Sequence, residues 1–177
     1  MKKAPTDADI LEAIRDNPDK GFRVLVSQYS QRVYWHIRRS VGSHHDAEDI
    51  TQETFLRIFR SLGSLKSEEA LTAWVYRIAS NEALRFIERR GSELLSLDCA
   101  ADMASDSYMD YSDIEAVDLK KAIDSLPPKQ KMAFNLRYYD ELEYDEIADI
   151  LGTSANNVRA NYHNAKERII KYMNLSI

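Results

Sequence analysis

The chain of 177 residues has one cysteine, five glycines, four prolines and no long apolar run. The single Cys99 excludes an intramolecular disulfide and a zinc site built from cysteines. Without about 18 consecutive apolar residues, no transmembrane helix is expected, and the N-terminus turns acidic before any apolar stretch, which argues against a signal peptide. Scarce glycine and proline favour helices. A content of 44% hydrophobic and 30% charged residues is typical of a globular cytoplasmic protein.

The net charge of −5 would argue against a nucleic-acid partner if it were spread evenly along the chain. Residues 91–114, however, carry six acidic and no basic side chains, whereas residues 1–90 have a net charge of +2 and residues 115–177 of −1. The acidic stretch is rich in Ser, Asp and Ala and lacks helical or alternating periodicity. We therefore predict an all-α protein in which an acidic flexible linker, 91–114, joins two small helical domains, 1–90 and 115–177.

Apolar residues in the first half recur at helical spacing. One predicted face comprises Phe22, Leu25, Val26, Tyr29, Val33 and Ile37. Gly42 and Ser43 break that helix, and we expect Asp46 to cap the next one, with Glu48 and Asp49 in its first turn. The buried stripe of this next helix is predicted to be Ile50, Thr54, Phe55, Ile58, Phe59 and Leu62. The residues predicted to lie on its outward side are Glu48, Gln52, Glu53, Leu56 and Arg60.

The cluster of His44, His45, Asp46, Glu48 and Asp49 also suggests a metal site, because imidazoles beside carboxylates suit divalent ions. The spacing is poor for that purpose, since adjacent histidines at a helix start diverge and no HExxH motif is present. We therefore favour a capped helix with an exposed acidic surface, and expect no metal.

The second half contains a strong local pattern, YDEIADILGTSANNVRANYH, over residues 144–163. A helix-turn-helix needs a small residue where its helices cross, a glycine in the turn and a β-branched anchor on the second helix. Ala148, Gly152 and Val158 meet these needs, and Ser154 is a natural N-cap for the second helix. Six acidic side chains lie between positions 138 and 152, whereas the chain from 153 onward has a net charge of +3. This polarity is typical of a helix that enters a DNA groove.

Three stretches carry a family resemblance: DAEDITQETFLRIFRSL (46–62), TAWVYRIASNEALRFIERR (72–90) and LPPKQKMAFNLRYYDELEYDEIADILGTS (126–154). In this order, with an acidic linker between the second and the third, the chain resembles the extracytoplasmic-function (ECF) sigma factors over about residues 10–175. These small bacterial proteins contain only sigma regions 2 and 4. The resemblance implies a non-enzymatic cytoplasmic protein without a cofactor, a small-molecule substrate or a membrane insertion, whose partners are core RNA polymerase and promoter DNA.

The resemblance also implies a role for each stretch. The 46–62 segment matches the surface that binds core polymerase, through Glu48, Asp49, Gln52, Glu53 and Leu56. The 72–90 segment matches the part that melts the −10 element and holds the single strand. Its candidate residues are Arg77, Asn81, Arg85, Arg89 and Arg90. Regulation by an anti-sigma factor is common in the family, so such a partner is a further expectation.

The helix from Ala155 matches the family's −35 reader in the major groove. Its candidate DNA contacts are Ser154, Asn157, Arg159, Asn161, His163 and Lys166. Many family members have a more basic helix of the form VKSRLHRARKRL, whereas this chain has VRANYHNAKERI. Arg159 keeps the first basic place, but Ala160, Asn161, Asn164 and Glu167 replace polar or basic residues of that form. These replacements predict a different −35 sequence and weaker phosphate attraction.

Two other functions are compatible with the residues alone. A stand-alone helix-turn-helix regulator would use its first half to sense a ligand or to dimerise, and would bind a palindromic site without polymerase. A metal-dependent phosphohydrolase would use His44, His45, Asp46 and Asp49, and would hold stoichiometric metal.

Overall fold

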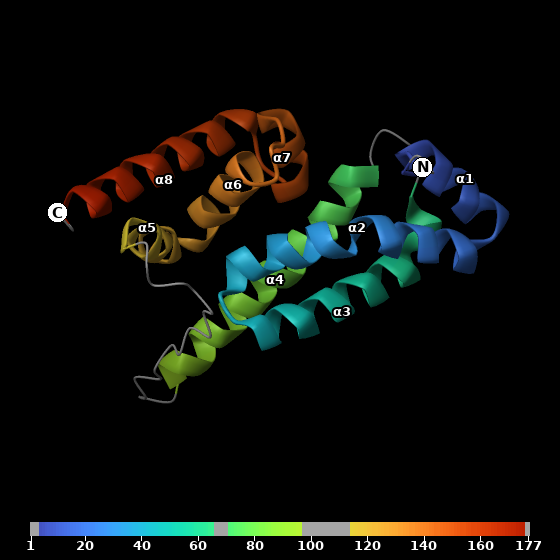
Figure 1. Ribbon diagram of the computed structural model, residues 1–177, viewed down its shortest axis with the longest axis horizontal. Helices are drawn as coiled ribbons and strands as arrows, with labels where there is room; N and C mark the ends of the chain where they lie inside the picture. The colour runs from blue at the N-terminus through green and yellow to red at the C-terminus, as the bar shows by residue number, and fades with distance from the viewer. Residues whose placement is uncertain (1–3, 66–70, 97–113, 176–177) are drawn as a thin grey trace.

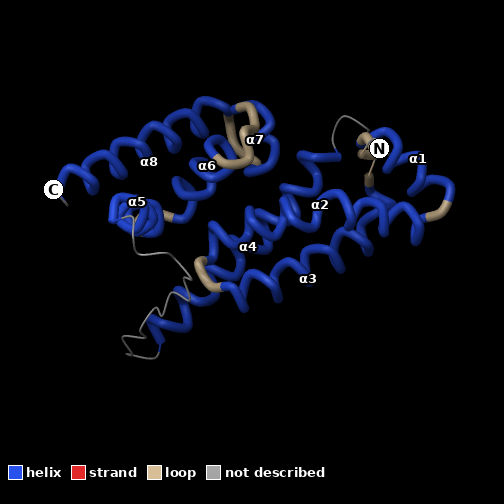
Figure 2. The backbone as a smooth tube through the Cα atoms, in the orientation of Figure 1, coloured by secondary structure: helices blue, strands red, loops and turns tan. Residues whose placement is uncertain are grey.

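The computed structural model describes residues 4–65, 71–96 and 114–175 (Figure 1). Over these residues the chain forms eight α-helices and one short 3₁₀ helix, η1 (Leu62–Ser64), with no strand (Figure 2). The predicted all-α fold is confirmed. Among the described helices, none combines the length and the apolar character that crossing a membrane requires.

The first half is a bundle built around one long helix. That helix is α2 (Pro18–Val41), which contacts α1 (Asp7–Asp16), α3 (His44–Ser61) and α4 (Leu71–Ser96). Its predicted apolar face holds, because Leu25, Tyr29, Val33 and Ile37 are fully buried, with Phe22 and Val26 packed against them. Burial and the neighbouring Asp7 raise the pKa of the Tyr29 hydroxyl, which donates to Asp7 at 2.8 Å and so ties α1 to the bundle.

The turn between α2 and α3 is made by Gly42 and Ser43, as predicted. Gly42 has φ of 83° and ends α2. The expectation that Asp46 caps α3 is wrong: Ser43 is the N-cap, and its hydroxyl accepts from the Asp46 backbone N–H at 3.3 Å. A serine hydroxyl can cap as well as a carboxylate. Asp46 therefore lies inside the first turn, and Glu48 and Asp49 lie one turn later than predicted.

The second half contains the predicted helix-turn-helix. Helix α7 (Tyr144–Leu151) ends at Gly152, whose φ of 62° is left-handed, and α8 (Ala155–Leu175) follows. The Asn157 backbone N–H donates to the Ser154 hydroxyl at 3.2 Å, so Ser154 is the N-cap of α8, as predicted. Val158 is fully buried at the crossing.

Two further helices, α5 (Ile114–Asp124) and α6 (Pro128–Tyr138), pack against α8. Asp124, at the end of α5, joins these elements through Lys131 of α6, whose Nζ lies 2.7 Å away. Burial opposes ionisation of Asp124, but Lys131 and Lys120 outweigh it and lower the pKa of this carboxyl.

Helix α4 runs to Ser96, so it includes the first six residues of the predicted linker. Residues 91–96 are thus helical, although their sequence shows no helical periodicity, because they extend an existing helix and need no new nucleus. The rest of the predicted linker before Ile114, with Cys99, lies outside the described residues. The division of the chain into two domains remains a prediction.

The two halves pack against each other. Helices α6 and α7 lie beside α2 and α4 (Figure 1), with α7 in contact with α4 and α6 in contact with α2. Tyr76 and Ala83 of α4 are buried in the same apolar cluster as Met132, Leu136 and Ile147 of the second half. The helix-turn-helix is therefore docked directly on the last helix of the first half.

Candidate functional site

The first candidate surface is the outward side of α3. Leu56 is 49% exposed, and the predicted polar residues Glu48, Asp49 and Gln52 are exposed around it, with Glu53 half-buried. The structure therefore brings all five predicted residues onto one helix face.

Phe59 extends this surface and was missed by the sequence prediction. It was expected in the buried stripe, but it is 42% exposed and packs edge-to-face on Phe22, with ring centroids 4.9 Å apart. Phe55 and Ile58 already fill the space beneath the helix, so Phe59 lies at the margin of the stripe. Its position three residues after the exposed Leu56, on the same side of the helix, is the signal that could have placed it here.

The two histidines at the start of α3 do not converge. His44 Nε2 lies 3.3 Å from Glu48, and His45 Nε2 lies 3.8 Å from Asp49. In each pair the two residues are one helical turn apart, and the two pairs run along different sides of α3. Within the described part of the chain, no group of three or more histidine, cysteine or acidic residues is arranged to hold a metal ion. The geometry is that of exposed surface pairs, which contribute little to stability.

A groove between α3 and α4 contains a buried acid that the sequence did not reveal. Glu82 is 9% exposed, forms an ion pair with Arg57, whose Nε lies 2.9 Å away, and accepts from Arg85 at 2.8 Å. Asp49, Glu53 and Arg89 line the same groove. Arg85 and Arg89, predicted to contact −10 DNA, are therefore set next to the acidic side of α3.

The −10 candidates on α4 do not form one set. Arg77 and Asn81 are exposed on the outer side of the helix, and Arg85 and Arg89 continue this side toward the groove. Arg90 lies 13 residues after Arg77, about 140° away around the helix at about 100° per residue. It faces α3, where it donates to Asp46 at 2.7 Å. The structure thus leaves Arg77 and Asn81 on the outer side of α4, sets Arg85 and Arg89 beside the groove with α3, and pairs Arg90 with α3 itself.

The −35 candidates on α8 divide into two groups. Arg159, His163 and Lys166 fall within about 60° of one another around the helix, whereas Asn157 and Asn161 lie on the opposite side. Arg159 lies 5.2 Å above the Tyr144 ring and donates to Asn156 at 3.0 Å. Asn157 instead donates to the Thr153 hydroxyl at 2.8 Å, next to the N-cap Ser154.

Asn156 lies between these two groups and was not among the predicted contacts. Its side chain is exposed at the start of α8, opposite the buried Val158. Its amide can serve as donor and acceptor to a base edge, as the amides of the predicted asparagines can. A helical wheel of α8 places Asn156 on the side opposite the buried Val158, so this signal could have added Asn156 to the predicted contacts.

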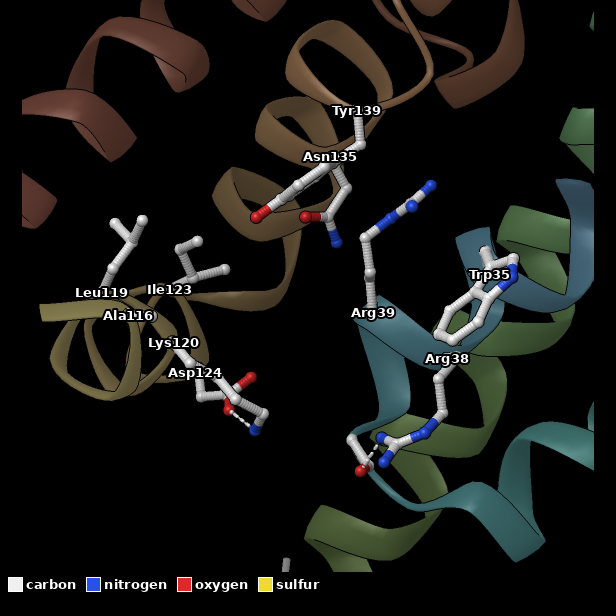
Figure 3. A pocket seen from close by; sticks show the side chains of 11 residues that line it. Trp35, Arg38, Arg39, Ala116, Leu119, Lys120, Ile123, Asp124, Asn135 and Tyr139 are labelled. Carbon is white, nitrogen blue, oxygen red and sulfur yellow. Dashed lines mark hydrogen bonds and ion pairs between the residues drawn. The ribbon is translucent and has the colours of Figure 1, made fainter. Parts of the chain in front are cut away.

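A cavity of about 440 Å³ lies between the two halves (Figure 3). Trp35 and Arg39 of α2 line one side, and Ile123, Asn135 and Tyr139 of α5 and α6 line the other. Trp35 is 49% exposed and Tyr139 41% exposed, so the cavity opens onto an apolar surface.

The helix-turn-helix, the acidic α3 surface and the basic α4 surface together define a protein of the sigma-70 class. The sequence matches the family "Sigma-70 region 2" over residues 25–93, which span most of α2 to α4. It matches "Sigma-70, region 4" over residues 116–169, from α5 into α8.

Comparison with individual proteins identifies the group within the sigma-70 class to which the chain belongs. The chain is 35% identical over 176 residues to the ECF RNA polymerase sigma factor SigE of Mycolicibacterium smegmatis, covering 96% of this chain and 68% of the relative. It is 30% identical over 183 residues to the ECF RNA polymerase sigma-E factor of Haemophilus influenzae, covering 96% of each. The Escherichia coli K12 ECF RNA polymerase sigma-E factor is 31% identical over 182 residues, with coverage of 96% and 95%. The chain belongs to the ECF RNA polymerase sigma factors.

Solved structures show the same fold. The sigma factor RpoE in complex with the anti-sigma factor NepR from Bartonella quintana superposes with a TM-score of 0.75 at 21% identity, covering 89% of this chain and 99% of that one. CnrH in complex with the cytosolic domain of CnrY gives a TM-score of 0.72 at 17% identity, with coverage of 97% and 99%.

Proposed function

We propose that this sigma factor binds core RNA polymerase through α3, melts −10 DNA with α4 and reads −35 DNA with α8. The observation that carries the proposal is the separation of surfaces: acidic and apolar groups gather on α3, whereas exposed basic and amide groups gather on α4 and α8. An acidic surface fits a protein partner and a basic helix fits the phosphate backbone. The site of action is the bacterial cytoplasm, and the protein itself catalyses no reaction.

The test is run-off transcription with core polymerase on genomic fragments, with and without this chain. We expect defined transcripts only in its presence. A stand-alone regulator would instead bind a palindromic fragment tightly without polymerase, and a phosphohydrolase would copurify with stoichiometric metal. Either result, together with no promoter-specific transcript, would contradict the proposed function.

Asn81→Ala should impair promoter opening more than duplex binding. The side chain is exposed on the outer side of α4, where its amide can hold an unpaired base that duplex DNA does not present. We expect about a tenfold loss of permanganate reactivity at −10, corresponding to one polar contact of about 1.4 kcal/mol, with gel-shift affinity nearly unchanged. Asn174→Ala, the same change at an exposed position near the end of α8, is the control. Equal losses of permanganate reactivity and of gel-shift affinity would show that Asn81 has no specific role in promoter opening.

Arg159→Ala should lower transcription from the cognate promoter by about tenfold, because one base or phosphate contact contributes about 1–3 kcal/mol. The guanidinium lies over Tyr144 at the start of α8, a position from which it can reach a groove. If it contacts phosphate, the salt dependence of promoter binding should also fall by about one unit of slope. Lys171→Ala, an exposed cation further along α8, is the control. Unaltered run-off transcription would refute the assignment.

An anti-sigma factor is the second partner that we propose. The superposed sigma factor RpoE was solved in complex with the anti-sigma factor NepR, and CnrH was solved in complex with the cytosolic domain of CnrY. This chain leaves large apolar side chains exposed around the cavity between its halves, including Trp35, Tyr139 and Leu119. The expected finding is a stoichiometric partner that copurifies from native cells and abolishes run-off transcription when it is added back. A copurifying protein without effect on transcription would not be this partner.

A further inference from the structure

A buried polar cluster joins the two halves, and Asp140, in the turn between α6 and α7, lies at its centre. The Asp140 carboxylate lies 2.8 Å from His36 Nδ1 and 2.7 Å from Arg39 Nη2, both on α2. The hydroxyl of Tyr76, on α4, is 3.4 Å from the same carboxylate. The Asp140 side chain is only 5% exposed, and His36 is fully buried. Among the described residues, the side-chain partners of Asp140 all belong to the first half.

The first half holds these donors in place. A carboxylate only accepts hydrogen bonds, so His36 Nδ1 carries the proton that faces Asp140. The opposite nitrogen, Nε2, lies 2.9 Å from the buried Ser80 hydroxyl, which fixes the ring from the other side. The Arg39 guanidinium also lies 4.7 Å above the ring of Tyr139, in the second half. Helices α2 and α4 thus present a prearranged set of donors to one turn of the second half.

Several features make this contact reversible. The attraction within a buried ion pair is largely offset by the loss of its hydration, so the pair fixes geometry more than it adds stability. Two buried atoms at the junction, Arg39 Nε and Asn135 Oδ1, have no hydrogen-bond partner within the described part of the chain. Figure 3 shows these two side chains on α2 and α6, on either side of the cavity. Opening would hydrate both atoms.

The second half keeps most of its own core on opening. In the apolar cluster beneath the junction, Tyr76 and Ala83 come from the first half, and the other eight buried members come from the second. Motion of two domains of one chain relative to each other is common where the contact between them is not a large hydrophobic one.

We call the arrangement in which the two halves pack against each other closed. A closed chain cannot contact both elements of a promoter at once. The −10 and −35 elements lie about 25 base pairs apart, which is about 85 Å along a duplex at about 3.4 Å per base pair. In the closed chain α7 packs directly on α4, and α8, which packs on α7, is only about 32 Å long. One duplex therefore cannot place its −10 element at α4 and its −35 element at α8 at the same time.

We propose that Asp140 is a latch that holds the free protein closed, and that binding of core polymerase releases it. In the closed form His36, Arg39 and Tyr76 engage the carboxylate, and in the open form all four side chains are hydrated. In this proposal polymerase shifts the equilibrium by binding the open form more tightly than the closed one, and the open form is the one that can place both DNA-reading helices. The inference rests on the proposed function for its purpose, but the latch itself is a property of the free chain.

The test measures the distance between the halves by double electron–electron resonance on the full chain. Spin labels are placed on cysteines at exposed Gln31 of α2 and exposed Lys129 of α6, in a Cys99→Ser background. The labelled protein that keeps Asp140 should give one short, narrow distribution of distances between the two labels. Asp140→Ala should give a broad, longer one, with the ratio of open to closed chains raised at least about tenfold, because closure would then bury donors without an acceptor. Addition of core polymerase should lengthen the distance in the unmodified latch.

Asp149→Ala removes an equally charged but exposed side chain from α7 and is the matched control, which should stay closed. Circular dichroism and a thermal melt of Asp140→Ala check that both halves remain folded, and Asp140→Lys, which repels Arg39, provides a second opening variant. A short distance in both Asp140 variants, or a long one in the free unmodified protein, would overturn the latch. If the distances behave as expected but no promoter-specific transcript appears, the proposed function fails and the latch stands.

Discussion

Replacing Gly21 by alanine is expected to lower the free energy of unfolding by about 3 kcal/mol. Gly21 lies in α2 where α1 crosses it, and a Cβ at this position would lie 2.4 Å from the backbone N and Cα of Ile14. Backbone atoms cannot rotate away as a side chain can, so α1 must shift and uncover Ile10 and Leu11, which are buried beneath it. The loss should appear as a melting temperature lower by about 6–12 °C and a lower denaturant midpoint.

Gly63→Ala is the matched control for this variant. An added Cβ at Gly63 meets no atom within 4 Å, so its stability should change by less than about 0.5 kcal/mol. Similar melting temperatures for Gly21→Ala and Gly63→Ala would show that α1 is not packed against α2 as described.

Replacing Glu48, Asp49 and Glu53 together by alanine is expected to weaken binding to core polymerase by about 100-fold. All three lie on the outward side of α3 around the exposed Leu56, and three charge contacts of about 1 kcal/mol each give this factor. Among the residues that the structure describes, they form only surface pairs with His44, His45 and Arg57 at 3.3–3.8 Å, so the variant should fold normally. Fluorescence anisotropy with labelled protein measures the affinity.

Glu12, Asp16 and Asp149 replaced together by alanine provide the control. They are exposed acids outside α3, and their removal changes the net charge by the same amount. This control separates a specific surface from long-range attraction, which depends on net charge and is screened by salt. Equal weakening by both triple variants, or none by the α3 variant, would contradict the assignment of α3 as the polymerase-binding surface.

Much of the local structure follows from neighbouring residues, and the sequence predicted those parts well. Gly42 and Gly152 end helices because each residue there adopts a positive φ, and Ser154 caps α8 through a hydrogen bond within its own turn. The burial of Leu25, Val33 and Ile37 follows from helical spacing alone. These features need no knowledge of which helices pack together.

Predictions were less accurate where a neighbouring helix decides the outcome. Arg90 was grouped with the DNA-facing arginines, but its position around α4 directs it to Asp46 of α3. Glu82 looks like one more exposed charge in the sequence, yet Arg57 from α3 covers it. In each case the position of α3 against α4, which local sequence does not encode, determines the environment of the side chain.

The sequence by itself determined most of the helices, the cap of α8, the helix-turn-helix and the charge on each surface, because these depend on spacing and residue type over one or two turns. Only the tertiary structure decided how the halves meet. Asp140 is 101 residues from Arg39 and 104 from His36, and nothing in its neighbourhood distinguishes it from the other acids of its acidic stretch. It is buried because the turn after α6 is inserted between α2 and α4, and a buried carboxylate requires the donors that it meets there.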